Sequence, residues 1–484
     1  MAFRSAVGSK LPLVIIMGAT GTGKTKLSLE LAQKFQTEII SADSMQVYKG
    51  LDVVTAKASP AERELVRHHL VDVLEPHQRF TVVDFRNRTL KIIQELTDKG
   101  KVPIIAGGTS YYIESIVFHN LVEGEDNSDE LLWDKSIRKR EIDAAGPSAD
   151  EPACKKAANS PEDNDNGVQV TNDPITIEIT DEFDQERVKY EMDHEHLLTN
   201  EQIHRRLMTI DPVQADKLHH NNRRKVLRSI EVWQKTGRRH SDILEEQKLT
   251  EGLLRRPGAT VMLWLKCEES VLEERLDARV ADMMEKGLVK ELLDFHDTYN
   301  KQRLKNGTEA DYTKGVFQSL GFKEFHKYLI MGEEQRQTEE GQKLLHECIE
   351  AMKLGTKRFA RRQTKNIVPW FLERDRRHRE VPAIYELDAT DLSEWDTQVK
   401  GKAIHIIQSY LNQDPCPFYL ARSRPKEDEA KPNPFGKHHC EVCQKIIIGD
   451  NEMKIHLNSN KHKKTLQRRK LEENTETIHR SKDN

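Results

Sequence analysis

The sequence predicts an α/β protein: a parallel sheet flanked by helices, interrupted by a mainly helical insertion and followed by a small module that carries cysteines and histidines. Three observations predict this class. Short apolar runs alternate with stretches of helical spacing, the first run leads into a glycine-rich turn, and two cysteines precede two histidines near the C-terminus. Strands that alternate with helices form a parallel sheet that is covered on both faces.

The expected elements follow from hydrophobic periodicity along the chain. A strand at Leu13–Met17, a glycine-punctuated turn at Gly18–Thr25 and a helix at Lys26–Phe35 open it. The later elements of the sheet domain are strands at Glu38–Ser41, Val102–Ala106 and Val261–Lys266, a helix at Tyr111–Phe118 and a long amphipathic stretch at Ser270–Tyr299. The insertion is expected to hold helices at Leu131–Asp143, Glu182–Met208 and Pro212–Lys235.

Length and charge bound the organisation and the partners. A chain of 484 residues suggests two to four domains. Its net charge of -4 is uneven, because residues 123–186 hold 19 acidic against 6 basic side chains, which leaves +9 on the other 420 residues. The near-neutral average therefore does not exclude a polyanionic partner such as nucleic acid.

Composition changes predict the domain boundaries. Residues 1–120 and 221–411 form the two parts of the sheet domain, and residues 121–220 form the helical insertion, with a disordered acidic loop at about 144–172. Five prolines mark a linker at 412–434, which leads to the cysteine-bearing module at 435–466 and a basic to polar tail at 467–484.

The glycine-rich turn fits the P-loop pattern G-x4-G-K-T. Its backbone N–H groups and the N-terminus of the following helix are suited to phosphate oxygens. Lys24 is expected to reach the terminal phosphate, and the Thr25 hydroxyl to ligate Mg²⁺. A chance glycine turn is the alternative. The residues expected to hold phosphate are Gly18, Ala19, Thr20, Gly21, Thr22, Gly23, Lys24 and Thr25.

Two polar residues are expected beside this P-loop. Asp43 ends the second strand, and Thr109 follows the strand Val102–Ala106, which ends in two glycines and lacks the acid that nucleotide hydrolases usually carry there. Because ligands of open α/β sheets bind at the carboxyl ends of the strands, both residues should share the crevice with the P-loop. A solvated loop aspartate is the alternative for Asp43.

Five motifs in order resemble those of one family, the tRNA dimethylallyltransferases or tRNA isopentenyltransferases. These motifs are the P-loop, Asp43–Tyr48, Gly107–Thr109, Asn221–Arg228 and Ser319–Glu324, and the resemblance spans about Leu11 to Gln363. It implies transfer of a dimethylallyl group from dimethylallyl diphosphate to the exocyclic amine of the adenosine just 3′ of the anticodon, with release of pyrophosphate.

The resemblance also implies roles for single residues. Asp43 matches the family's catalytic acid, which orients the amine and accepts its proton. Thr109 matches a crevice threonine that contacts the adenine or the diphosphate, and Arg228 matches an arginine that closes over the diphosphate. Lys24 and the rest of the P-loop hold the diphosphate with Mg²⁺, so no nucleotide is hydrolysed.

Contacts to the tRNA anticodon stem-loop are expected from three groups. Ser44, Met45 and Gln46 match the family's tRNA contacts, and the target adenosine must flip out of its stack to react. A helix start offers Arg223, Arg224 and Lys225, for which a solvated face is the alternative, and where the family often has Arg this chain has Lys225. Nine basic residues with interleaved aromatics lie at Lys357–Arg379 and include Lys357, Arg358, Arg361 and Arg362. In the insertion, Arg205 and Arg206 suit backbone contacts.

The C-terminal module fits a C2H2 zinc finger of the matrin or U1 type. The ligands Cys440, Cys443, His456 and His462 are spaced C-x2-C-x12-H-x5-H, which suits a closed tetrahedral Zn²⁺ site with a structural role. Such fingers are associated with structured RNA, and a finger after the catalytic part resembles the animal form of the family. Protein contact and nuclear targeting are the alternatives.

Two other functions fit part of the sequence. A P-loop kinase of a nucleoside or small metabolite fits residues 18–25 but leaves Asp43–Gln46 unexplained. A non-catalytic RNA-binding finger protein fits the C-terminus but leaves the P-loop without a role. The longest apolar run is far below 18 residues, so no membrane association is expected, and a monomer is the default because one crevice is enough. Six cysteines without a disulfide pattern indicate a reducing compartment, expected to be cytoplasm and mitochondrion, with the nucleus as a further alternative.

Overall fold

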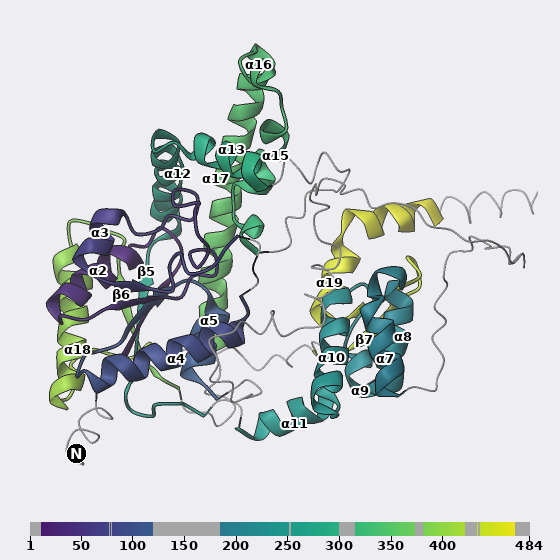
Figure 1. The fold of residues 1–484 in the computed structure, drawn as a ribbon, viewed down its shortest axis with the longest axis horizontal. Coiled ribbons are helices and arrows are strands. Elements are labelled where there is room, and N and C mark those ends of the chain that lie inside the picture. The colour runs from purple at the N-terminus through teal and green to yellow at the C-terminus, as the bar shows by residue number, and fades with distance from the viewer. Residues whose placement is uncertain are drawn as a thin grey trace, which may run out of the picture. The chain divides into compact units, whose positions relative to one another are not determined.

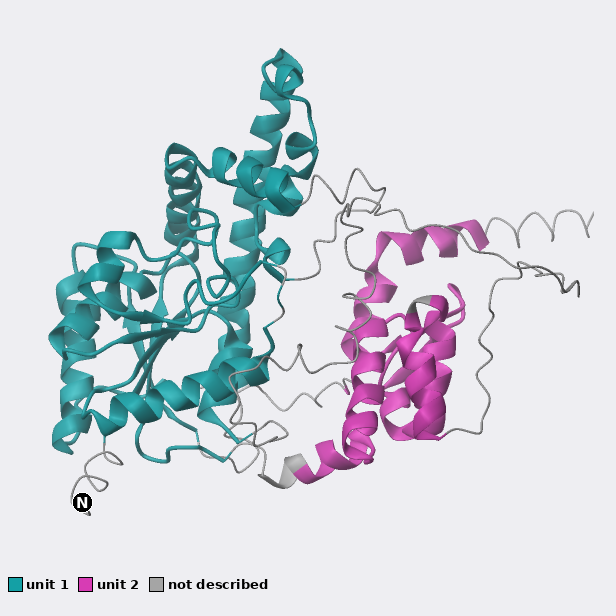
Figure 2. Ribbon diagram, viewed as in Figure 1, with its two compact units in different colours: residues 1–136, 250–424 teal, residues 137–249, 425–484 magenta. Residues whose placement is uncertain are grey.

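A computed structural model describes residues 11–76, 78, 80–119, 184–250, 253–299, 315–372, 381–421, 433 and 436–469. The expected helix at 131–143 and the acidic loop at 144–172 lie outside the described residues. The chain separates into two compact units, one of residues 1–136 and 250–424 and the other of residues 137–249 and 425–484 (Figure 2). Each unit has a hydrophobic core of its own.

The first unit is built on one sheet of six strands. Every neighbouring pair is parallel, in the order β3-β2-β4-β1-β5-β6. The strands are β1 (Leu13–Gly18), β2 (Ile39–Ser41), β3 (His68–His69), β4 (Ile104–Gly107), β5 (Thr260–Lys266) and β6 (Ala383–Asp388). The expected α/β class with a parallel sheet is therefore confirmed.

Helices cover both faces of this sheet (Figure 1). The helices of the first unit are α2 (Lys24–Lys34), α3 (Pro60–Leu65), α4 (Val82–Asp98), α5 (Ser110–Val117), α12 (Glu269–Glu285), α13 (Leu288–Tyr299), η2 (Gly315–Gln318), α15 (Phe322–Leu329), α16 (Glu333–Arg336), α17 (Glu339–Ile367), η3 (Val368–Leu372), η5 (Trp395–Gly401) and α18 (Lys402–Asn412). Successive side chains of β1 point to opposite faces of the sheet, so they pack against two different layers of helices. Leu13, Ile15 and Met17 pack in a core shared with α4, α5 and α17, whereas Val14 and Ile16 pack with α2 and α18.

The order of the strands decides where the site lies. Strands β2, β4 and β1 are adjacent, so the segments that leave their carboxyl ends meet at one edge of the sheet. These three segments are the P-loop after β1, the Asp43 segment after β2 and the Gly108–Thr109 turn after β4.

The expected elements of the sheet domain differ from the structure in two respects. The stretch Ser270–Tyr299 is two helices, because the chain turns at Gly287, whose φ of 88° belongs to the left-handed region that favours glycine. The edge strands β3 and β6 were not expected. Strand β3 has only two residues, and β6 extends the sheet in register with β5 from Ala383 onward.

The second unit contains a cluster of helices. They are α7 (Gln185–Asp193), η1 (Glu195–Leu197), α8 (Asn200–Ile210), α9 (Pro212–Asp216), α10 (Arg223–Thr236) and α11 (His240–Thr250). The expected helix Glu182–Met208 is wrong as one element, because Thr199 caps a new helix through its hydroxyl and Gln202 completes the capping box. The expected helix Pro212–Lys235 is also two helices.

The same unit holds a small finger at its C-terminal end. Strands β7 (Lys437–Cys440) and β8 (Lys445–Ile448) form an antiparallel hairpin, and α19 (Asp450–Asn458) follows. A second helical segment covers 460–469. Among the described residues, no helix is both long enough and apolar enough to cross a membrane.

Candidate active site

The P-loop connects the end of β1 to the start of α2. Gly21 and Gly23 have φ values of 84° and 93°, which residues other than glycine rarely adopt. A Cβ at Gly21 would lie 2.8 Å from Leu276 of α12, and a Cβ at Gly23 would lie 2.7 Å from the Trp395 ring. The P-loop is thus held closely by segments far along the chain, and α2 begins directly at Lys24.

Lys24 is the cation of this loop, and it is half-buried. Its Nζ donates to the backbone carbonyl of Ala19 at 2.7 Å. Burial and, secondly, the nearby Arg279 guanidinium lower the pKa of Lys24 to about 8, against the opposing effect of the Asp43 carboxylate. A bound phosphate would stabilise the charged form of Lys24, so this lysine favours the binding of an anion.

Asp43 and Thr109 lie side by side beyond β2 and β4. The Thr109 backbone N–H donates to the carbonyl of Ala42 at 3.3 Å, and the Ser44 backbone N–H donates to the Thr109 hydroxyl at the same distance. One Asp43 carboxylate oxygen accepts the Met45 N–H at 2.8 Å, which fixes its side chain. The expected proximity of Asp43, Thr109 and the P-loop therefore follows from the strand order.

Two glycines allow this close approach. A Cβ at Gly107 would lie 2.2 Å from the carbonyl oxygen of Ala42, which is backbone and cannot move aside. A Cβ at Gly108 would lie 2.1 Å from the Gln363 amide nitrogen. Neither glycine has a positive φ, so the backbone conformation does not call for glycine at these positions. Glycine is favoured at both because a side chain would collide with these neighbours.

Gln363 is a site residue that sequence reasoning did not single out. It lies on α17, is buried, and accepts the Thr20 N–H of the P-loop at 2.8 Å. Its amide nitrogen donates to the Gly108 carbonyl at 3.2 Å. One side chain thus joins the P-loop to the turn that carries Thr109, and the only sequence signal was its place within the basic stretch Lys357–Arg379.

Arg279 is a second residue that was missed. Leu272 and Leu276 of α12 pack against Ala19 of the P-loop, and Arg279 continues the same face one turn later. Burial lowers the pKa of Arg279, whereas the carboxylates of Asp43 and Asp282 oppose the effect. Arg279 therefore adds positive charge beside Lys24 and Asp43, and nothing local in the amphipathic α12 sequence distinguished it.

The segment after Asp43 is held by its own side chains. Gln46 accepts from the Ser41 hydroxyl at 2.9 Å, and its amide nitrogen donates to the carbonyls of Thr55 and Ala56 at 3.2 Å. The Gln46 amide, expected to contact tRNA, is thus also engaged within the fold, whereas Ser44 and Met45 are half-buried.

A buried lysine holds the same segment farther along the chain. Lys57, whose side chain is fully buried, pairs with Asp52 and Asp72.

The basic residues of α17 divide into two groups. Lys357 pairs with Asp277 at 2.7 Å. Arg361 pairs with Glu269 at 2.5 Å and also with Glu273. Acidic side chains of α12 therefore pair with both basic residues. Arg358, Arg362 and Lys365 are exposed, and no acidic side chain in the described part of the chain pairs with them. Their spacing of four and three residues aligns them on one helix face.

The basic start of α10 belongs to the second unit. Arg223 donates to the carbonyls of Leu198 and Glu195, so its guanidinium ties α10 to η1 and to the residue that follows it. Arg224 and Lys225 are exposed, and the Arg228 side chain is 55% exposed, 3.6 Å from Glu231. The expected closure of Arg228 over the diphosphate stays a prediction, because Arg228 and the P-loop lie in different units.

One expectation for the helical unit is wrong. Arg206, expected at an RNA backbone, has a fully buried side chain that pairs with buried Glu191 at 2.5 Å. Its charge therefore holds α8 to α7. Its neighbour Arg205 is exposed.

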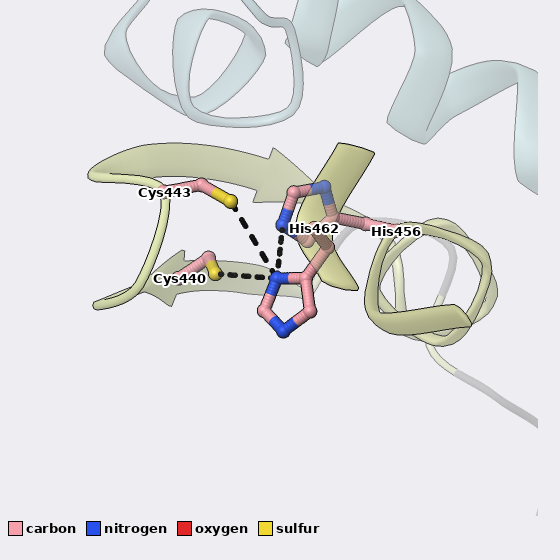
Figure 3. A group of neighbouring side chains, drawn as sticks. All are labelled: Cys440, Cys443, His456 and His462. Atoms are coloured by element: carbon pink, nitrogen blue, oxygen red, sulfur yellow. Dashed lines mark hydrogen bonds between the residues drawn. The ribbon is translucent and has the colours of Figure 1, made fainter. Parts of the chain in front are cut away.

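The cysteine and histidine pairs converge in the finger (Figure 3). The four possible ligand atoms lie within 4.8 Å of one another. The Sγ atoms of Cys440 and Cys443 are each 3.5 Å from His462 Nδ1, which is 3.2 Å from His456 Nε2. Bonds of about 2.3 Å to sulfur and 2.0–2.1 Å to nitrogen in a tetrahedron require ligand separations of about 3.3–3.8 Å. The cluster could therefore bind zinc.

Comparison with known proteins agrees with the motifs and the fold. A family model described as IPP transferase matches residues 46–156 and 170–372. The tRNA dimethylallyltransferase of Homo sapiens is 38% identical over 466 residues, covering 95% of this chain and 87% of the human protein. That of Saccharomyces cerevisiae is 30% identical, covering 94% and 92%. A solved eukaryotic dimethylallyltransferase acting on tRNA superimposes with a TM-score of 0.68 and 29% identity, over 97% of this chain and 100% of that one. With most of its length matched in sequence and in fold, this chain belongs to the IPP transferase family.

Proposed function

We propose that this chain transfers a dimethylallyl group from dimethylallyl diphosphate to the exocyclic amine of the tRNA adenosine next to the anticodon, at position 37, and releases pyrophosphate. The observation that carries the proposal is the meeting of a P-loop, Asp43 and Thr109 at the ends of three adjacent strands. The human and yeast relatives are named for dimethylallyl transfer to tRNA, which supports the same reaction here.

The chemistry divides between a leaving group and a nucleophile. The bond between the dimethylallyl carbon and the diphosphate oxygen breaks, and the amine nitrogen of adenosine forms the new carbon–nitrogen bond. Asp43 accepts the proton that the amine loses. Charge that grows on the departing pyrophosphate is stabilised by the P-loop N–H groups, the N-terminus of α2 and the Lys24 ammonium.

Mg²⁺ fits the same site. Thr25 lies in the first turn of α2 with an exposed side chain, and among described residues its hydroxyl makes no hydrogen bond. Such a hydroxyl would hold Mg²⁺, which would neutralise part of the diphosphate charge. Thr109 lies next to Asp43, where it can contact the adenine or the diphosphate.

The direct test incubates the protein with dimethylallyl diphosphate, Mg²⁺ and an unmodified tRNA that has adenosine 3′ of the anticodon. Prenylated adenosine, detected by mass spectrometry of the nucleosides, is expected. If ATP is consumed with a nucleoside while no prenylated adenosine forms, the chain is a kinase and the proposal fails. If tRNA binds and neither product forms, it is a non-catalytic RNA-binding protein.

Asp43 offers a sharper test of the mechanism. Asp43→Asn keeps an oxygen that can accept the Met45 N–H but removes the proton acceptor, so turnover should fall by about 10²–10⁴-fold. tRNA affinity, measured by filter binding, should stay close to that of the unaltered protein. Loss of tRNA binding with unchanged turnover of the bound tRNA would make Asp43 a binding residue instead.

We also propose that the finger binds Zn²⁺ as a structural ion and adds affinity for tRNA. Lys461, Lys463 and Lys464 are exposed beside the ligand His462 and suit phosphate contacts. Deletion of residues 434–484 should leave the chemistry intact and weaken tRNA binding, with a shallower dependence on salt. An inactive truncation would instead make the finger part of the catalytic fold.

A further inference from the structure

Two large aromatic side chains lie together on the surface of the first unit. The rings of Tyr111 and Trp370 meet edge to face, with centroids 4.3 Å apart and an interplanar angle of 89°. Tyr111 is 64% exposed, whereas Trp370 is half-buried and packs against the hydrophobic core beneath it. Trp370 is therefore a fixed support, and Tyr111 presents its ring to solvent.

This pair lies beside the proposed active site. Tyr111 is two residues beyond Thr109, the N-cap residue of α5. Trp370 is seven residues beyond Gln363, about 10 Å along a helix at 1.5 Å per residue, and Gln363 contacts the P-loop. Helix α17 packs on α5 (Figure 1), and Tyr111 lies in the first turn of α5, so the aromatic pair is close in the chain to both Thr109 and Gln363.

The surroundings favour an RNA partner over an apolar one. Arg358, Arg362 and Lys365 of α17 are exposed, and in the described ranges no acidic side chain pairs with them. Phe359, which is 40% exposed, is three residues before Arg362 on the same helix. Basic residues interleaved with exposed aromatic rings suit a phosphate backbone and unstacked bases.

We propose that Tyr111 and Trp370 form a stacking platform for a loop nucleobase of the RNA substrate, next to the adenosine that enters the site. The inference rests on the proposed function and deepens it by naming residues that recognise the loop. A base that leaves its stack when the neighbouring adenosine flips out recovers stacking on the Tyr111 ring. Because Trp370 already holds that ring, little conformational freedom is lost on binding.

The test measures the binding of an RNA hairpin with the loop of an unmodified tRNA anticodon arm. Tyr111→Ala and Trp370→Ala should each weaken binding by about 5- to 150-fold at fixed salt. Tyr111→Phe and Trp370→Phe should retain most of the affinity, whereas Tyr111→Leu should not, because stacking of the base needs an aromatic ring at that position. Unfolding midpoints of all variants serve as the control for folding.

Salt dependence separates stacking from charge. The slope of log affinity against log salt should be unchanged in Tyr111→Ala, whereas the matched variant Arg362→Gln should make it shallower. A 2-aminopurine base placed in the hairpin loop should lose fluorescence on binding the unaltered protein and lose less on binding Tyr111→Ala.

Two outcomes distinguish this inference from the proposed function. If the unaltered protein forms prenylated adenosine but both alanine variants bind the hairpin as tightly as it does, the platform is refuted, as it would be if these aromatics served a protein partner. If the hairpin binds through the aromatic pair yet no prenylated adenosine forms, the stacking platform stands and the proposed reaction is refuted.

Discussion

Two substitutions of Gln363 should distinguish how the geometry of the P-loop and how the charge beside it each affect pyrophosphate affinity. Its amide oxygen accepts the Thr20 N–H at 2.8 Å and its amide nitrogen donates to the Gly108 carbonyl at 3.2 Å. Gln363→Glu preserves the size and the first of these bonds, and it places a carboxylate beside the loop that receives the diphosphate. Gln363→Ala removes both bonds without adding charge.

The magnitudes follow from these contacts. Each lost hydrogen bond costs about 0.5–1.5 kcal/mol, so Gln363→Ala should lower the free energy of unfolding by about 1–3 kcal/mol. If the new carboxylate of Gln363→Glu came within roughly 4 Å of a bound phosphate, repulsion would amount to about 1–4 kcal/mol per pair of charges. Pyrophosphate affinity should therefore fall by about 5-fold to several hundred-fold in the glutamate variant, and less in the alanine variant.

Isothermal titration with pyrophosphate and Mg²⁺ measures the affinities without relying on prenyl transfer, and chemical denaturation measures the stabilities. Thr364→Ala is the matched control, because its exposed hydroxyl bonds only to the Ala360 carbonyl of its own helix among the described contacts. That variant should bind pyrophosphate as the unaltered protein does. Equal pyrophosphate affinities for the glutamate and alanine variants would refute the placement of Gln363 at the diphosphate site.

Three further predictions concern charge and metal. Because the pKa of Lys24 is lowered to about 8, pyrophosphate affinity should fall as the pH rises through 8 and the ammonium loses its proton; titrations of Lys24→Met, which should lack this component, supply the comparison. Arg206→Leu should cost about 3–5 kcal/mol of unfolding free energy, because buried Glu191 would keep only the longer ion pair to the half-exposed Arg187 at 3.4 Å, and Glu191→Leu in addition should restore most of it in denaturant melts. Cys443→Ser should abolish the binding of about one zinc ion per chain and speed hydrogen exchange across residues 436–469 while leaving the sheet protected; equal exchange with and without zinc would rule out a structural ion.

The local elements of the sheet domain could be predicted because each depends on residues close in sequence. The strands β1, β2, β4 and β5 and the helices α2 and α5 appear within a few residues of their expected bounds. The failures are also local in origin. One glycine turn at Gly287 and one capping box at Thr199 interrupt stretches whose apolar spacing continues across the break.

Charge was the least predictable property of the site. The sequence predicts that Lys357 and Arg361 contact tRNA, yet acids of α12, about eighty to ninety positions earlier, pair with them. Arg206 is buried against Glu191, whereas Arg362 stays exposed. Sequence shows that a side chain is charged, but only its neighbours in space decide whether that charge is available to a partner.

The sequence by itself determined the glycine-rich P-loop, the positions of Asp43 and Thr109 at the ends of neighbouring strands, and the spacing of the finger cysteines and histidines, because these depend on short motifs and strand ends. Only the tertiary structure decided what holds them together. Gln363 reaches Thr20 across 343 positions, and Arg279 joins Lys24 from the face of α12. Such contacts arise when distant helices pack on one edge of the sheet, and no periodicity within a single segment encodes which of their side chains will meet.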